Sequence, residues 1–153
     1  MKKITQLKFV LILTLSLFSF TMNFAQSSTD EKKITQQIET FFEGLNAKDT
    51  IQLKSTMIGK VGLKSVLIKN GEKQLVTEEM SAFINQIGNL PNDLIIEEKV
   101  QNMKVSIRFP LAEVFTDYIF YINNEKSHSG INLFTLAFMD SEWKIINIVD
   151  TRQ

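Results

Sequence analysis

The sequence predicts an α+β domain in which N-terminal helices pack on a strongly curved antiparallel sheet. Apolar residues recur at helical spacing in three segments between residues 28 and 91. Residues 94–150 are instead rich in Ile, Val, Phe and Tyr, with turn residues between the runs. Because the helical part comes first and the strand-rich part last, the helices can cover one face of a single sheet. Such an arrangement leaves a conical cavity, which is a natural small-molecule site.

The first 25 residues have the pattern of a secretory signal peptide. Three lysines lie within residues 1–8, and an apolar run over residues 9–20 follows, which is too short to span a bilayer. The small residue Ala25 then occupies a position suited to cleavage. We therefore expect cleavage before Gln26 and a mature domain over residues 26–153, exported to the periplasm or secreted and free of the membrane. A short buried helix is the alternative, but the polar segment that follows disfavours it.

The composition excludes several classes of function. The chain has no cysteine and one histidine, so it cannot form disulfides, thiolate metal sites or a cysteine nucleophile. Three of its 17 basic residues and none of its 17 acidic residues lie in the predicted signal, so the mature charge is −3. The sequence has no basic patch of the kind that binds nucleic acid. It also has no glycine-rich phosphate-binding loop and no Gly-x-Ser-x-Gly motif. We expect no metal and no cofactor.

The first two helices have recognisable start signals. Ser28 and Glu31 have the spacing of a capping box, and a broad apolar face follows as far as Leu45. Asp49 and Gln52 have the same spacing and predict a second, short helix.

A hairpin and a third helix come next. Residues 62–76 predict two strands joined at Asn70-Gly71, a pair suited to a tight turn. A third helix is predicted from Thr77, carries one apolar side and ends at Gly88. Four long antiparallel strands in meander order are then expected over residues 94–107, 111–122, 126–139 and 143–150.

Two segments carry a resemblance to a known superfamily. FFEGLNAKD (Phe41 to Asp49) and EWKIINIVDTR (Glu142 to Arg152) resemble the end of the first helix and the closing strand of nuclear-transport-factor-2-like proteins. That superfamily includes ketosteroid isomerases and polyketide cyclases. The resemblance implies a cone-shaped fold with an internal cavity, and a homodimer through the outer face of the sheet.

A narrower resemblance covers most of the mature chain. Residues 114–138, with their Phe-Tyr pair, Asn-Asn turn and Ser-His-Ser-Gly segment, together with the Asp-Thr-Arg ending, are similar to the bacterial exported family named for lumazine binding. Two positions depart from that pattern: Asn124 stands where glycine is usual, and Asp117 where an apolar residue or proline is typical.

The hairpin around Asn123-Asn124 places the single histidine. A two-residue turn there puts His128 opposite Ile119. Alternation then puts Asp117 and Tyr121 on the His128 face as diagonal neighbours. A carboxylate beside an imidazole raises the pKa of the imidazole and orients the ring, which favours acid–base or binding roles. The alternative is a histidine that serves only as a hydrogen-bonded structural residue.

The register of the last strand is open on sequence grounds. A two-residue turn at Asp140-Ser141 puts Trp143 on the His128 face, whereas a three-residue turn puts Asp150 and Arg152 there, because a slip of one residue exchanges the faces. We favour the second arrangement, which gathers the polar side chains into one cluster. Asp150 and Arg152 could otherwise form a surface ion pair that contributes little to stability.

These residues lead to a functional hypothesis. We expect an exported cone-fold domain that binds a small apolar or heteroaromatic ligand in its cavity. The predicted ligand-binding residues are His128, Asp117, Tyr121, Asn132, Asp150 and Arg152. One alternative is a lyase or isomerase, of the dehydratase or ketosteroid-isomerase type, that uses His128 with Asp117. Another is a non-catalytic module that dimerises through an apolar patch of Tyr118, Phe120, Ile131 and Leu133.

Overall fold

The computed structural model describes residues 28–153, which fall into two units, residues 28–32 and residues 33–153. The predicted signal peptide, residues 1–25, lies outside the described residues. In the part of the chain that is described, no helix is long and apolar enough to cross a membrane.

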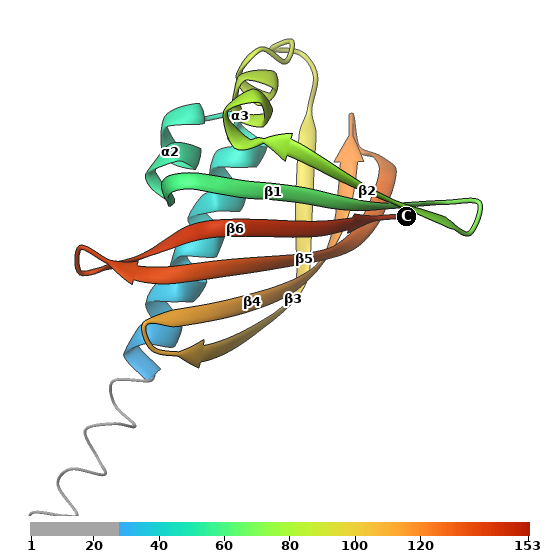
Figure 1. Cartoon of the computed structure of the whole chain (residues 1–153). Helices are drawn as coiled ribbons and strands as arrows, with labels where there is room; N and C mark the ends of the chain where they lie inside the picture. The colour runs from blue at the N-terminus through green and yellow to red at the C-terminus, as the bar shows by residue number, and fades with distance from the viewer. Residues whose placement is uncertain (1–27) are drawn as a thin grey trace, which may run out of the picture. The chain divides into compact units, whose positions relative to one another are not determined.

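The second unit consists of helices that cover one face of a six-stranded sheet (Figure 1). A long helix includes residues 33–47. The other elements are α2 (Thr50–Ser55), β1 (Met57–Lys69), β2 (Glu72–Glu79), α3 (Met80–Gly88), β3 (Ile96–Arg108), β4 (Leu111–Ile122), β5 (Glu125–Met139) and β6 (Glu142–Arg152).

The long helix ends where the sequence predicts a break. Lys48 adopts a left-handed conformation with φ 57°, and the backbone N–H of Asp49 donates back to the Gly44 carbonyl at 2.8 Å. The Asp49 carboxylate then accepts the backbone N–H groups of Ile51 and Gln52, both at 2.9 Å, and so caps α2. The two helices therefore meet at a sharp corner that packs both against the same sheet.

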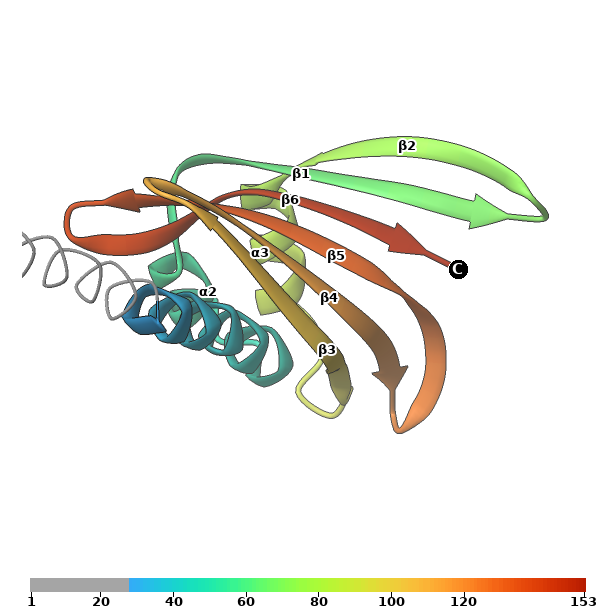
Figure 2. The same cartoon turned by 90° about the horizontal axis from the view of Figure 1, so that it is seen from below.

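The sheet confirms the α+β fold class and adds one detail. Strands β3 to β6 form the predicted antiparallel meander, while the strand order β2-β1-β6-β5-β4-β3 places β1 parallel to β6. The sheet is thus mixed. Single extra residues at Gln101, Ser127 and Ile146 interrupt the pairing of β3, β5 and β6. Such bulges increase local twist and bending, which accounts for the strong curvature seen in Figure 2.

The hairpin turns form as predicted, but one helix boundary differs. Asn70-Gly71 and Asn123-Asn124 are both tight turns with positive φ at each residue. The third helix begins at Met80, and its predicted start at Thr77 was wrong. Pairing of β2 with β1 continues to Glu79, which lies opposite Gly62. Residues 77–79, which the sequence pattern assigned to the helix, therefore belong to β2.

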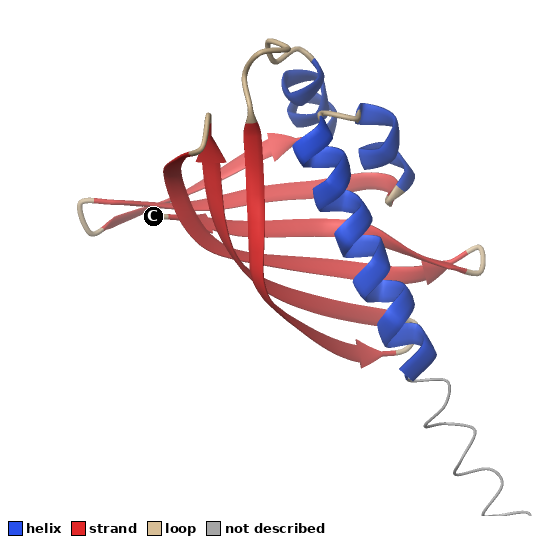
Figure 3. Cartoon of the chain, turned by 180° about the vertical axis from the view of Figure 1, so that it is seen from behind, coloured by secondary structure: helices blue, strands red, loops and turns tan. Residues whose placement is uncertain are grey.

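The core lies between the helices and the sheet face that they cover, here called the inner face (Figure 3). Its centre is a cluster of three rings from the long helix and β5. Phe41, Phe42 and Phe134 meet edge to face, with ring centroids 5.4–5.6 Å apart. These rings mark the middle of the inner face, and two of them, Phe41 and Phe134, also line a cavity.

Candidate functional site

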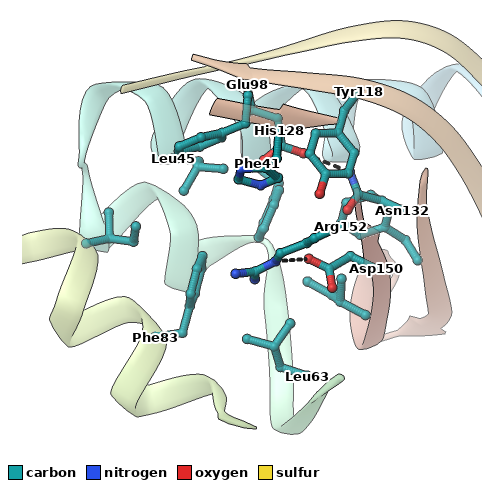
Figure 4. Close-up of a pocket in the computed structure, with 14 residues that line it drawn as sticks. Phe41, Leu45, Leu63, Phe83, Glu98, Tyr118, His128, Asn132, Asp150 and Arg152 are labelled. Atoms are coloured by element: carbon teal, nitrogen blue, oxygen red, sulfur yellow. Dashed lines mark hydrogen bonds and ion pairs between the residues drawn. The ribbon is translucent and has the colours of Figure 1, made fainter. Parts of the chain in front are cut away.

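A cavity of about 210 Å³ lies between the inner face and the helices. Its wall is aromatic and aliphatic, and its polar side chains come from β3, β4, β5 and β6 (Figure 4). The lining residues are Phe41, Leu45, Leu63, Phe83, Ile87, Glu98, Tyr118, Phe120, His128, Asn132, Phe134, Ile148, Asp150 and Arg152. An apolar wall with a few converging polar groups is typical of a small-molecule site.

The structure corrects the predicted surroundings of His128. Tyr121 pairs with Lys126 as expected, but the bulge at Ser127 then shifts the register, so that His128 lies opposite Phe120 rather than Ile119. The prediction that Asp117 and Tyr121 share the His128 face was therefore wrong.

Both displaced residues have partners away from the cavity. The Asp117 carboxylate accepts a hydrogen bond from Asn102 at 2.8 Å. The Lys99 ammonium nitrogen lies over the Tyr121 ring, 5.0 Å from the centroid of that ring. A His128–Asp117 pair is consequently not formed, and neither residue position supports the catalytic pair expected from the sequence.

The last strand follows one predicted register in its first half and the other in its second half. Asp140-Ser141 is a two-residue turn, so Trp143 and Ile145 enter the core. The extra residue Ile146 then reverses the alternation, and Asp150 and Arg152 reach the cavity. His128, Asp150 and Arg152 of the predicted polar cluster therefore lie together, without Asp117, and the reason is a bulge rather than a longer turn.

Asp150 and Arg152 form an ion pair inside the cavity. Arg152 Nε donates to Asp150 Oδ2 at 3.0 Å. The Asp150 side chain is 10% exposed and that of Arg152 is 39% exposed, so the carboxylate is the buried partner. Figure 4 shows the Arg152 side chain crossing the cavity, with its guanidinium nitrogen atoms turned toward the side on which Phe83 lies.

Glu98 is the second acid of the cavity. Burial, opposed by a hydrogen bond from Asn132 and reinforced by the charge of Asp150, raises the pKa of Glu98 to about 7. Asn132 Nδ2 donates to Glu98 Oε1 at 2.8 Å and lies 3.3 Å from the Thr116 hydroxyl oxygen. The carboxyl group of Glu98 is thus partly protonated near neutral pH, where an ordinary carboxyl group is almost fully ionised.

His128 is held by rings rather than by an acid. Its imidazole stacks on Phe120 at 5.0 Å between centroids and meets Tyr118 edge to face at 5.8 Å. Nδ1 lies 3.1 Å from the Ser127 hydroxyl oxygen. Burial, followed by the charge of Arg152, lowers the pKa of His128 below its usual range against the opposing effect of Asp150. The imidazole is therefore neutral at pH 7.

Tyr118 is fixed by a close approach of three strands. Its hydroxyl donates to the Thr151 carbonyl at 2.9 Å. Gly130, opposite Tyr118, leaves the space for this contact, because a Cβ there would overlap the Thr151 carbonyl and come within 2.9 Å of the tyrosine ring. Burial, together with the charges of Asp150 and Glu98, raises the pKa of Tyr118, so the phenol stays protonated.

Four of the six predicted ligand-binding residues line the cavity: His128, Asn132, Asp150 and Arg152. The sequence analysis missed Glu98, although a signal was present. Ile96 is buried, and alternation from it puts Glu98 on the inner face. An acid at an inward position of a strand is rare enough to have been singled out.

No protein-family model and no curated protein matches the sequence. The structure is similar to a nuclear-transport-factor-2-like protein of unknown function from Silicibacter pomeroyi, with 16% identity, a TM-score of 0.65 and coverage of 83% of this chain and 98% of that one.

Two further solved structures show the same likeness. A protein of the same fold family from Streptomyces avermitilis, described provisionally as a dehydratase, has 12% identity, a TM-score of 0.64 and coverage of 83% and 98%. A cystatin-like protein of unknown function from Nostoc punctiforme has 10% identity, a TM-score of 0.63 and coverage of 82% and 92%. The narrower resemblance to the family named for lumazine binding stays a prediction. The chain has the nuclear-transport-factor-2-like, or cystatin-like, fold.

Proposed function

We propose that this chain binds a small, partly aromatic molecule in the cavity of its inner face. The observation that carries this proposal is the convergence of Glu98, His128, Asn132, Asp150 and Arg152 on a cavity whose other walls are apolar. Burial of polar groups in a core costs free energy unless they are paired. The other half of the inner face, near the β5–β6 turn, buries almost no polar groups. An apolar cavity of roughly 150 Å³ holds benzene, so a space of about 210 Å³ suits a ligand of one or two rings.

A thermal-shift and calorimetric screen of pterins, flavin precursors and simple aromatics tests the proposal. The pteridines are included because of the narrower family resemblance. A binding compound should raise the melting temperature of the wild type. His128→Trp should abolish the shift, because the larger ring fills the cavity. Asp117→Asn is the matched control on the other sheet face and should leave the shift unchanged. Absence of any shift across the screen would contradict the proposal.

A second candidate is a lyase or isomerase in which Glu98 transfers the proton. The favouring observation is the pKa of Glu98, raised by burial to about 7, where a carboxyl group can both give and take a proton. One structure of the same fold, from Streptomyces avermitilis, is described provisionally as a dehydratase. If this candidate is right, Glu98→Gln should lower turnover by about 100-fold or more while ligand affinity survives. Equal turnover by wild type and variant would exclude it.

We also propose that the outer sheet face forms a homodimer. The predicted patch was wrong in composition, because Tyr118 and Phe120 line the cavity. The outer face nevertheless carries Leu111, Phe115 and Ile131, each more than 40% exposed. Light scattering at high micromolar concentration should give a dimer mass for the wild type and a monomer mass for Phe115→Lys. Leu75→Lys, which changes a residue on β2 that is 64% exposed, is the control. A wild-type monomer would contradict the proposal.

Export is the last part of the proposal. The basic start, the short apolar run and Ala25 support removal of residues 1–25. Mass spectrometry of the protein from its native cell should find Gln26 as the first residue. A chain that retains Met1 to Ala25 would exclude both cleavage and the exported location that it implies.

A further inference from the structure

The strongest unexplained feature of the cavity is one oxygen atom of Asp150. The residue is 7% exposed, and its Oδ2 accepts from Arg152 Nε. Its Oδ1 is buried and has no hydrogen-bond partner among the described residues. A buried carboxylate oxygen without a donor is unfavourable, and such an atom in a native structure calls for an explanation. Since Asp150 lines the cavity, a donor on a bound molecule would satisfy this need.

The charges around the cavity define which donor fits. Arg152 contributes one positive charge and Asp150 one negative charge, and they form a pair. Glu98 is about half ionised at pH 7, and His128 is neutral. The net charge of the lining residues therefore lies between zero and −1. An anionic ligand would lack compensation and would place a second acceptor near Asp150 Oδ1, whereas a neutral or cationic donor would be stabilised.

The cavity walls restrict the rest of the ligand to a flat apolar shape. Phe41 and Phe134 form the inner end, and the stacked rings of Phe120 and His128 form another side. A ring edge or face packs favourably on such walls. The remaining Arg152 nitrogen atoms, which reach into the cavity in Figure 4, can donate to a carbonyl on the same ligand.

We infer that the ligand is an aromatic compound without negative charge that carries an N–H donor, and that Asp150 Oδ1 accepts this donor. The compound is an aromatic amide, amidine or ring N–H heterocycle, rather than an aromatic acid or a plain hydrocarbon. This inference rests on the proposed function of the cavity and specifies the ligand class for that same site.

Four single-ring probes of similar size separate the possibilities. Benzamide and benzamidine carry N–H donors, benzoate carries only acceptors, and toluene carries neither. Calorimetry on the full wild-type domain should show benzamide or benzamidine binding at least about 10-fold more tightly than benzoate and toluene, because a hydrogen bond to a charged group contributes that much. Equal or tighter binding of benzoate or toluene would overturn the inference while leaving the proposed cavity function intact. Failure of all four to bind would overturn the inference, and a negative thermal-shift screen in addition would overturn the proposed function.

Two variants test whether Asp150 causes the preference for probes that carry an N–H donor. Asp150→Asn should reduce binding of benzamidine by about 10-fold or more and bring it close to that of benzoate. Asp117→Asn removes a carboxylate from the other face of β4 and should preserve the wild-type ranking. An unchanged ranking in folded Asp150→Asn would contradict the assignment. If that variant does not fold, the ranking of the four probes on the wild type decides the inference alone.

Discussion

The two halves of the inner sheet face differ sharply in chemistry, although the same strands build both. One half, near the β5–β6 turn, buries Val114, Leu136, Trp143 and Ile145 at 0–2% exposure and holds no ionisable group among its described residues. The other half, toward the end of β6, holds the acids, the arginine and the histidine of the cavity. The ring of Phe134 lies at the boundary. The first, here called the packed half, stabilises the fold. The second, here called the functional half because it holds the proposed ligand site, carries polar groups whose burial costs stability.

The bulges explain how one face can hold both halves. Ser127 and Ile146 each add one residue to a strand, so the side chains that follow exchange faces. Without the extra residue at Ile146, the register that buries Trp143 and Ile145 would send Asp150 and Arg152 to the outer face. The bulge at Ile146 thus places apolar side chains in one half of the inner face and polar side chains in the other, while the pairing of β5 with β6 continues on both sides of it.

The largest expected effect comes from removing the boundary ring. Phe134→Ala leaves a cavity where three rings meet, and should lower the free energy of unfolding by about 3–5 kcal/mol. Urea denaturation followed by circular dichroism measures this change. Leu75→Ala, on β2 and 64% exposed, is the control and should cost less than about 1 kcal/mol. Similar losses for both would show that the packed half does not dominate stability.

The next effect tests how closely the functional half is built. Gly130→Ala should destabilise the domain by about 2–4 kcal/mol, because the added methyl group overlaps the Thr151 carbonyl and presses on the ring of Tyr118. The neighbouring Ser129→Ala adds no atom and should be nearly neutral. Thermal and urea unfolding of the two variants give the comparison, and a fully stable Gly130→Ala would refute the close approach.

Glu98 should make the functional half a source of pH dependence. Its pKa is about 7 in the folded state and near 4.5 otherwise, so the folded state binds more protons between these values. Stability due to this group is therefore complete below pH 4.5 and is lost as pH rises to 7. Glu98→Gln keeps the acceptor for Asn132 but cannot ionise, and should exceed the wild type by roughly 2 kcal/mol above pH 7.5 and match it at pH 4.5. Urea unfolding across this pH range tests both arms, and a constant difference between the two proteins would contradict the raised pKa.

The sequence predicted more of the packed half than of the functional half. Helix faces and the Asn70-Gly71 and Asn123-Asn124 turns depend on neighbouring residues, and those signals are local. A bulge has no comparable local signal: nothing in the residues around Ser127 marks it as the extra residue. Every side-chain assignment that crossed that bulge was consequently reversed, which explains why Asp117 was paired with His128 in place of Tyr118.

The smallest expected effect on stability comes from removing the Tyr118 hydroxyl. Tyr118→Phe removes only the hydroxyl that donates to the Thr151 carbonyl, and should lower the free energy of unfolding by about 1 kcal/mol. The ring, which meets His128 edge to face, remains in place, so the cavity should keep its shape. Ligand affinity should then change little unless the hydroxyl itself contacts the ligand. Parallel measurements of unfolding and of benzamide binding distinguish the two roles: a stability loss alone assigns Tyr118 to holding β4 against β6, whereas a loss of affinity without a loss of stability would place its hydroxyl among the groups that recognise the ligand.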